Sequence, residues 1–351
     1  MLMQTNAMLR TRPRTMALWL FIVAAMIVAM VMVGGITRLT ESGLSITQWK
    51  PISGTLPPLT DAAWQAEFDG YKKIPEYREI NVGMTLAGFK AIFFWEYVHR
   101  LLGRLIGLAF ALPLIWFAIR RQIPRGYGWR LSALLALGGL QGAIGWWMVA
   151  SGLSVRTDVS HIRLAVHLST ALILLGGIVW TALDLRAAHN MAGNLAIARP
   201  SRLVPVAAVA LVLLGVQIIF GAFTAGLDAG YAFASWPLMG DAWFPAGAPM
   251  VSPAWRNAVD NPIVVQFIHR WFAFAAAAGL GLLAWQAIRQ GAARAGYAIG
   301  GLVTLQILLG IATLMSGVAI EIAVAHQVNA ALTLIAAIVA AHQLGRHRTI
   351  G

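Results

Sequence analysis

Four histidines occupy matching places in four apolar segments. Each lies 19 to 21 residues before an arginine: His99 before Arg120, His167 before Arg186, His269 before Arg289 and His326 before Arg346. About 20 helical residues, at about 1.5 Å each, cross the ~30 Å hydrocarbon core of a bilayer. If the arginines mark one membrane face, the histidines mark the other. The spacing therefore predicts two pairs of imidazoles near one membrane surface.

Composition sets the class of protein. The 351 residues are 59% hydrophobic and 11% charged, with mean hydropathy +0.72, which is typical of an integral membrane protein. We expect an all-α fold of eight transmembrane helices, at residues 16–36, 88–119, 131–150, 163–185, 203–225, 262–288, 296–317 and 321–343. The chain has no cysteine, which excludes a disulfide or a thiolate metal site.

The distribution of charge predicts the orientation. The two terminal tails and the loops after the second, fourth and sixth spans hold fourteen of the 26 basic residues and essentially no acids. The opposite loops hold seven basic residues and eleven acids. By the positive-inside rule, both termini are cytoplasmic and the long loops at 37–87 and 226–260 face outward. This topology accounts for the net charge of +13 better than nucleic acid does, so we expect no nucleic-acid partner.

The first four and last four spans follow one plan. The residues that recur at equal spacing are Gly34, Thr37, Gly43 and Trp49 with Gly221, Thr224, Gly230 and Trp236, and Leu140, Gln141, Gly145, Ser151 and Gly152 with Leu305, Gln306, Gly310, Ser316 and Gly317. An even number of spans per unit gives both units the same orientation. We expect two parallel-repeat four-helix bundles, at residues 1–190 and 191–351, each with one histidine pair.

One difference separates the two units at the histidines. Glu96 lies three residues before His99, whereas Gln266 stands at the matching place before His269. Residues three apart share a helix face, so the carboxylate borders whatever His99 binds. Only the first unit therefore combines the histidine pair with an acid.

Buried imidazoles allow three interpretations: a satisfied polar group, a proton relay, or a ligand to metal or haem. Two pairs at matched depth favour ligation. Zinc or copper would normally recruit carboxylates, thiolates or a third histidine, whereas bis-histidine haem needs one residue from each of two facing helices. The pattern therefore favours haem.

Other polar residues near these spans have less specific readings. His161 lies six residues before His167, on another helix face, and is expected to be interfacial or to support the site. A group of arginines near the outer ends of the spans could pair with the haem propionates. The alternative roles are side chains that extend to the membrane surface or, for Arg100, an ion pair with Glu96. These arginines are Arg38, Arg100, Arg163 and Arg270. Three histidines at the opposite side are expected to be solvated, namely His189, His342 and His347.

Several motifs resemble haem A synthase over about residues 16–343. They are TRLTESGLSITQWKPISGTLPPL, EYVHRLLGR, SHIRLAVHLSTAL, AGLDAGYAFASWPLMGDAWFP and AHQVNAALTL. The chain is similar to the proteobacterial and mitochondrial branch, because the outer-loop cysteine pair of the other branch is absent. The two long loop motifs are the specific part of the resemblance.

The resemblance implies oxidation of a ring methyl of haem O to a formyl group, giving haem A for terminal oxidase assembly. It assigns His269 and His326 to a resident haem b, places His99 and His167 around the substrate haem, and makes Glu96 the essential acid. It also implies a bacterial inner-membrane protein among lipids, with haem O synthase and an electron donor as partners and a homo-oligomeric state to be tested.

Two other classes of protein remain open from the residues alone. A di-haem b cytochrome that transfers electrons laterally at the outer face also uses paired histidines. A transporter is suggested by the repeat, although transporters usually place substrate sites near the midplane. The haem pigments of the purified protein separate the three classes.

Overall fold

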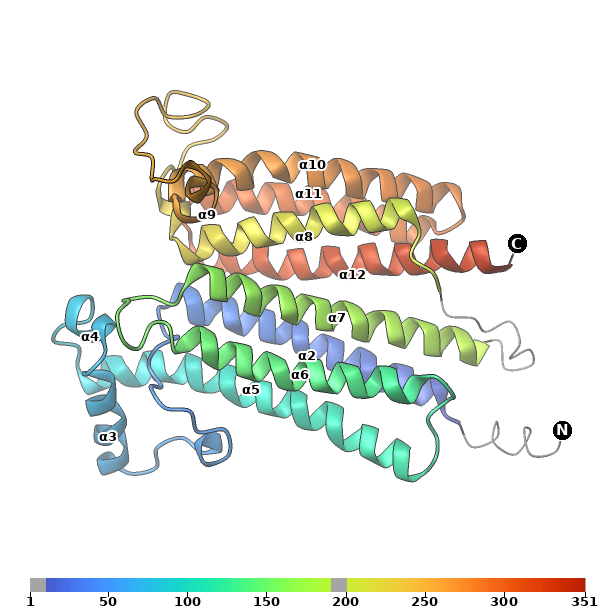
Figure 1. The fold of residues 1–351 in the computed structure, drawn as a ribbon, viewed down its shortest axis with the longest axis horizontal. Coiled ribbons are helices and arrows are strands. Elements are labelled where there is room, and N and C mark those ends of the chain that lie inside the picture. The colour runs from blue at the N-terminus through green and yellow to red at the C-terminus, as the bar shows by residue number, and fades with distance from the viewer. Residues whose placement is uncertain (1–10, 191–200, 351) are drawn as a thin grey trace.

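Eight long helices dominate the computed structural model, which describes residues 11–190 and 201–350 (Figure 1). All eight are long and apolar enough to cross a membrane. They are α2 (Pro13–Leu39), α5 (Leu86–Ile119), α6 (Tyr127–Val149), α7 (His161–Asn190), α8 (Pro205–Gly226), α10 (Pro262–Arg289), α11 (Ala293–Met315) and α12 (Ile320–Ile350). The prediction of eight spans in an all-helical chain is confirmed, with ends that shift by a few residues.

Local sequence explains where several of these helices begin. The Thr85 hydroxyl accepts a hydrogen bond from the Gly88 amide at the start of α5, and the Asn261 side chain caps the first turn of α10. Both caps satisfy backbone N–H groups that the first helical turn leaves without a partner. A proline begins α2, α8 and α10, where its missing N–H costs nothing.

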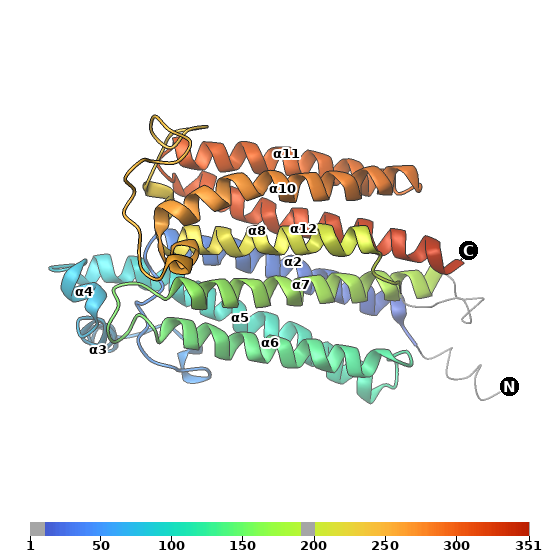
Figure 2. The same cartoon turned by 45° about the horizontal axis from the view of Figure 1, so that its top comes forward.

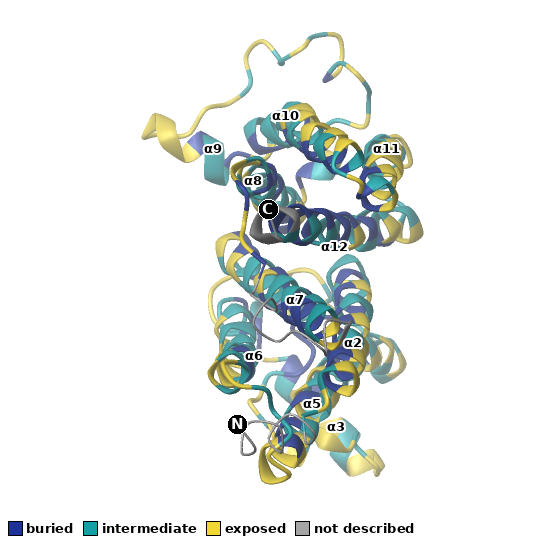
Figure 3. Ribbon diagram, turned by 90° about the vertical axis from the view of Figure 1, so that its right-hand side faces the viewer, coloured by how far each residue is buried: buried dark blue, intermediate teal, exposed yellow. Residues whose placement is uncertain are grey.

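The helices form two groups of four along the chain. In the first group α2 packs on α5 and α7, and α6 packs on α7; in the second, α10 packs on α8 and α11, and α11 on α12. The groups meet where α12 contacts α2 and α7, and where α7 contacts α8 (Figures 2 and 3). The division into two units at residue 190 stays a prediction, because the two groups share a broad interface.

Short helices cover one end of the first group. α5 has 34 residues, so at about 1.5 Å each it is about 50 Å long and continues beyond a ~30 Å hydrocarbon core. On its extension lie α3 (Asp61–Tyr71) and α4 (Pro75–Glu79), at the end of the molecule away from both termini (Figure 1). Phe68, Tyr71 and Phe89 form a buried aromatic cluster there, with ring centroids 5.0 to 5.3 Å apart. This cluster fixes the loop that precedes α5.

The opposite end carries a buried polar network that joins the two groups. Asp184 of α7 lies 2.7 Å from Arg130 Nη1 and 2.8 Å from His342 Nε2 of α12. The Ser201 amide also donates to Asp184. His342 is only 3% exposed, so the expectation that it is solvated was wrong: its partner comes from the other group, which the sequence pattern does not reveal.

The two other histidines at this end have different outcomes. His189 is exposed, as expected. The side chain of His347 lies outside the described residues.

Glu76 is a buried carboxyl in the short helices outside the spans. It is 4% exposed, and its Oε2 has no hydrogen-bond partner among the described residues. Burial, reinforced by the negative charges of Glu41, Asp158 and Glu96, raises the pKa of Glu76 to about 8. The folded protein therefore holds Glu76 protonated at pH values where the unfolded chain, with its ordinary pKa near 4.5, has lost that proton.

We predict a pH-dependent stability from this group. A raised pKa contributes stability that is present below about pH 4.5 and is lost as the pH rises through about 8. Glu76→Gln keeps the neutral shape, so it should raise the thermal unfolding midpoint in detergent at pH 8 by at least about 2 °C and flatten its pH dependence. Glu79→Gln, on the exposed face of the same short helix, is the matched control. An unchanged pH slope in Glu76→Gln would contradict the assignment.

Candidate functional site

The four histidines lie in pairs on helices at opposite corners of each group. His99 is on α5 and His167 on α7, while His269 is on α10 and His326 on α12 (Figure 3). Within each pair the residues are close enough to interact electrostatically. The structure thus brings the histidines together in the pairs that the repeat predicts.

Each imidazole packs against a glycine of a neighbouring helix. A Cβ added to Gly34 would lie 3.4 Å from His99 Nε2. Cβ atoms on Gly145, Gly221 and Gly310 would lie 2.9, 3.0 and 3.0 Å from Cε1 of the respective histidines. Distances near 3 Å leave no room for a methyl group, so these glycines let the rings enter the space between helices. This explains four of the glycines that recur in the sequence.

Glutamine side chains hold three of the four histidines. Gln141 Nε2 donates to the His167 carbonyl at 2.8 Å and lies 3.1 Å from its Nδ1. Gln217 makes the same two contacts with His269, at 3.0 and 3.1 Å. Gln306 does so with His326, at 3.1 and 3.2 Å. We call this arrangement the glutamine clamp. In each case the amide NH₂ group, which only donates, holds the histidine backbone through its carbonyl and lies against the ring at Nδ1.

The glutamine clamp was only partly visible in the sequence. Gln141 and Gln306 recur in the repeat, but no function could be given to them. Gln217 has no counterpart in the first group and was missed. A useful signal would have been a glutamine four residues before a recurrent glycine, as Gln217 is before Gly221.

Glu96 is held as a buried acceptor beside His99. It is 2% exposed. Its Oε2 accepts hydrogen bonds from Ser45 Oγ at 2.7 Å and from the Ile46 amide at 2.6 Å. Its Oε1 accepts two from Arg100, at 3.0 Å from Nε and 2.6 Å from Nη2. An ionised carboxylate has only acceptors, and here every partner is a donor.

Gln266 occupies the matching place, and the surroundings of one of its two polar atoms differ from those of Glu96. It is 1% exposed, and its Nε2 donates to the carbonyl oxygens of Phe233 at 3.1 Å and Gly230 at 3.4 Å. Its Oε1 accepts from Arg270 Nη2 at 3.3 Å, as Glu96 accepts from Arg100, but a carboxylate there would place its other oxygen against carbonyl oxygens, with no hydrogen to share. The loops of the two groups thus select different side chains, a carboxylate in the first and an amide in the second.

The four outer arginines bond to protein groups. Arg100 binds Glu96 and the carbonyls of Gln48 and Ile46, so the ion-pair reading is present. Arg270 donates to the carbonyls of Phe233, Ser235 and Leu238. Arg38 lies 2.8 Å from Asp228, and Arg163 donates to the Trp147 carbonyl. A propionate contact stays a prediction for each of them.

His161 lies at the junction of the two groups. It is 5% exposed, and its Nε2 is 3.2 Å from Asp260 Oδ1. A Cβ on Gly226 of α8 would lie 2.6 Å from the His161 Cβ, so the helices touch at this level. His161 therefore joins the groups, in keeping with its expected place outside the histidine pair.

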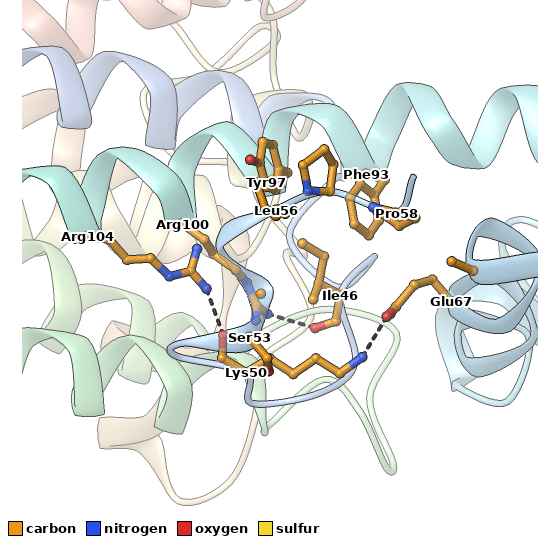
Figure 4. Close-up of a pocket in the computed structure, with 13 residues that line it drawn as sticks. Ile46, Lys50, Ser53, Leu56, Pro58, Glu67, Phe93, Tyr97, Arg100 and Arg104 are labelled. Carbon is orange, nitrogen blue, oxygen red and sulfur yellow. Dashed lines mark hydrogen bonds and ion pairs between the residues drawn. The ribbon is translucent and has the colours of Figure 1, made fainter. Parts of the chain in front are cut away.

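A pocket of about 140 Å³ lies between α5 and the loop at residues 46–58 (Figure 4). Its walls include Phe93, Tyr97, Arg100 and Arg104 of α5, and Lys50 of the loop. Arg100 lines the pocket and also binds Glu96. The pocket therefore ends one side chain from the carboxylate.

The donor set fits haem better than a bare metal ion. Within residues 11–190 and 201–350, no group of three or more histidines, cysteines or acids comes together to hold an ion. A haem supplies four nitrogens itself and needs only two axial imidazoles. The paired histidines, with glycines that let the rings lie between the helices and glutamines that hold three of the four residues in place, fit that requirement.

Comparison with known proteins gives a consistent family. The family model COX15-CtaA, described as cytochrome oxidase assembly protein, matches residues 17–338. The haem A synthase of Sphingopyxis alaskensis is 55% identical over 339 residues, covering 97% of this chain and 94% of that protein. The haem A synthase of Rhizorhabdus wittichii is 56% identical, covering 95% of this chain and 95% of that protein. The haem A synthase of Novosphingobium aromaticivorans is 51% identical, covering 96% of this chain and 98% of that protein. No solved structure matches.

These matches cover all eight spanning helices, and the family assignment drawn from the loop motifs is confirmed. The chain therefore belongs to the haem A synthase (COX15-CtaA) family of membrane oxidoreductases, which serve haem A biosynthesis and cytochrome oxidase assembly.

Proposed function

We propose that the first helix group binds haem O between His99 and His167 and oxidises its ring methyl to a formyl group. The second group holds a resident haem b between His269 and His326. The observation that carries this division is the buried Glu96, whose carboxylate accepts hydrogen bonds from Ser45, Ile46 and Arg100. The second group has Gln266 at the same position, and its amide donates to a carbonyl instead. An acid beside one histidine pair alone marks that pair as the reaction site.

The hydrogen bonds that support the clamp glutamines of the two sites favour the same division. In the second group Asn329 donates to Gln306 Oε1 at 2.6 Å, so the clamp on His326 is itself held. The matching residue in the first group is Thr170, which bonds to the Val166 carbonyl of its own helix. Among the described residues, Gln141 Oε1 and Gln217 Oε1 are both buried without a partner, so this extra support belongs to the His326 clamp alone. A permanently occupied site benefits from rigid support, whereas a site that exchanges substrate and product needs less.

Glu96 can act in the oxidation in two ways. Converting a methyl to an aldehyde removes protons and electrons, and a carboxylate can accept a proton or stabilise developing positive charge. The resident haem, when bound, supplies one-electron chemistry. Arg100 and Ser45 hold the carboxylate in place, and Arg100 also lines the pocket beside the outer loop.

We further propose that both termini are cytoplasmic and that the histidine pairs lie near the outer face. The long loops and α3 and α4 lie at one end of the bundle, and the first residues of α2 and the last residues of α12 lie at the other (Figure 1). The excess of basic residues lies at the second end. The positive-inside rule then orients the molecule.

A prediction on orientation uses the absence of native cysteine. Leu59→Cys, in the outer loop and 76% exposed in the native residue, should react with a membrane-impermeant maleimide in intact cells. His189→Cys, exposed at the other end, should react only after the cells are permeabilised. The reverse labelling pattern would invert the topology.

A second prediction separates the two histidine pairs. Purified protein, expressed with a haem O synthase, is extracted and its haems are separated by chromatography. Variants His269→Ala and His326→Ala should lose haem b, because an axial ligand is missing. Variants His99→Ala and His167→Ala should keep haem b and lose most haem O and haem A. His189→Ala is the control.

The same extraction tests the other classes of protein. A laterally transferring cytochrome would yield haem b alone from the wild type, and a transporter would yield no haem. Either result would overturn the proposal.

A third prediction concerns the acid. Glu96→Gln should keep haem b and haem O but lower haem A formation by about 10²- to 10⁴-fold, the usual effect of removing a general acid or base. Glu79→Gln, exposed in the outer layer, should leave haem A unchanged. Normal haem A in Glu96→Gln would remove Glu96 from the reaction.

A further inference from the structure

His99 is the one histidine of the four without a glutamine clamp. Among the residues that the structure describes, no side chain forms a hydrogen bond with its ring, whereas His167, His269 and His326 each contact a glutamine. The repeat shows what replaces it. Gln217 lies four residues before Gly221, and the residue four before Gly34 is Met30.

Met30, at the matching repeat position, also faces the helix that carries the histidine. Its methyl carbon lies 3.4 Å from where a Cβ on Gly103 would be, and Gly103 is one turn after His99 on α5. The Met30 side chain therefore faces α5 one turn from His99, whereas Gln217 faces α10 and bonds to His269 itself. A thioether has no N–H, so it donates no hydrogen bond to the His99 carbonyl.

The His99 ring also meets its glycine differently. Its Nε2 atom is the one nearest to Gly34, whereas the three clamped histidines turn Cε1 toward their glycines. The absence of the clamp thus coincides with a different presentation of the ring. The three clamped rings are thus restrained by a side chain from a neighbouring helix and the His99 ring is not, and changes in such supporting contacts around a ligand typically alter metal affinity about 10- to 100-fold.

The position of His99 gives this difference a chemical consequence. Iron held by two imidazoles within a porphyrin has six ligands and no place for a small molecule. Glu96 lies three residues before His99 on the same helix face, whereas His167 is on the facing helix α7. Release of His99 would open the iron on the side of the acid, and release of His167 would open it on the far side.

We propose that His99 is the exchangeable ligand of the substrate iron, released because Met30 replaces the glutamine that would hold it, while clamped His167 remains bound. This inference rests on the proposed binding of haem O between His99 and His167. In the exchange the bond between iron and His99 Nε2 breaks, the electron pair stays on the imidazole, and a neutral small molecule takes the position. No electron is transferred in this step.

Carbon monoxide is a direct probe, because it binds ferrous haem only where a coordination position opens. The full-length wild type, expressed with haem O synthase and reduced, should bind carbon monoxide at a fraction of its haem equal to its extracted haem O and haem A. Met30→Gln should keep that haem content but bind carbon monoxide at least about tenfold more slowly, and should form less haem A. Met32→Gln, the same exchange on an exposed face of α2, is the control.

The reciprocal variant tests the same rule in the second group. Gln217→Met removes the clamp on His269, so haem b should become reactive toward carbon monoxide, which it is not in the wild type. If Met30→Gln fails to retain haem O, this variant still tests whether the glutamine clamp controls carbon monoxide binding. Carbon monoxide binding that is unchanged in both variants would overturn the role of Met30.

The outcome for the proposed function is distinguishable. Wild type that yields only haem b, or His99→Ala that retains all its haem O and haem A, would refute the binding site itself. Haem O present in the wild type, with Met30→Gln reacting like the wild type, would refute only the inference about His99.

Discussion

Polar groups inside a membrane must find their partners within the protein, and this requirement organises the molecule. An unpaired donor or acceptor in hydrocarbon costs several kcal/mol, since no water is present to replace the lost hydrogen bond. The glutamine clamp is one answer to this constraint: Gln141, Gln217 and Gln306 each tie a histidine to a neighbouring helix. The same amide group donates to the backbone carbonyl and lies against the ring, so one side chain serves both the helix packing and the position of the ring.

The constraint also explains why the two repeats differ at one position. A buried carboxylate needs donors on all its free edges, and Ser45, Ile46 and Arg100 provide them. A buried amide needs an acceptor for its N–H groups, and the Phe233 carbonyl provides one for Gln266. The difference between a carboxylate and an amide is therefore matched in the outer loops, which present the Ile46 amide to Glu96 and the Phe233 carbonyl to Gln266. The outer loops are part of each site, and their long motifs are the specific part of the family resemblance.

The two groups are linked at both ends of the bundle and along its length. Arg38 pairs with Asp228 and His161 with Asp260 at the end that holds the histidines. At the other end Asp184 of α7 joins His342 of α12. Between them Gln327, the residue after His326, donates to the Val31 carbonyl of α2 at 3.1 Å. A change at one histidine pair therefore has a short covalent and hydrogen-bonded path to the helices of the other.

The sequence by itself determined the features that depend on one segment at a time. Hydropathy over about 20 residues predicts eight spans, and identical residues at equal spacing predict the repeat and the pairing of the histidines. The sequence repeat also shows that Glu96 in the first unit corresponds to Gln266 in the second. Only the tertiary structure decided which polar side chains meet across helices. The partner of His342, the clamp of Gln217 and the place of Met30 depend on helices more than 50 residues apart, and a membrane helix shows little periodicity by which its buried face could be recognised.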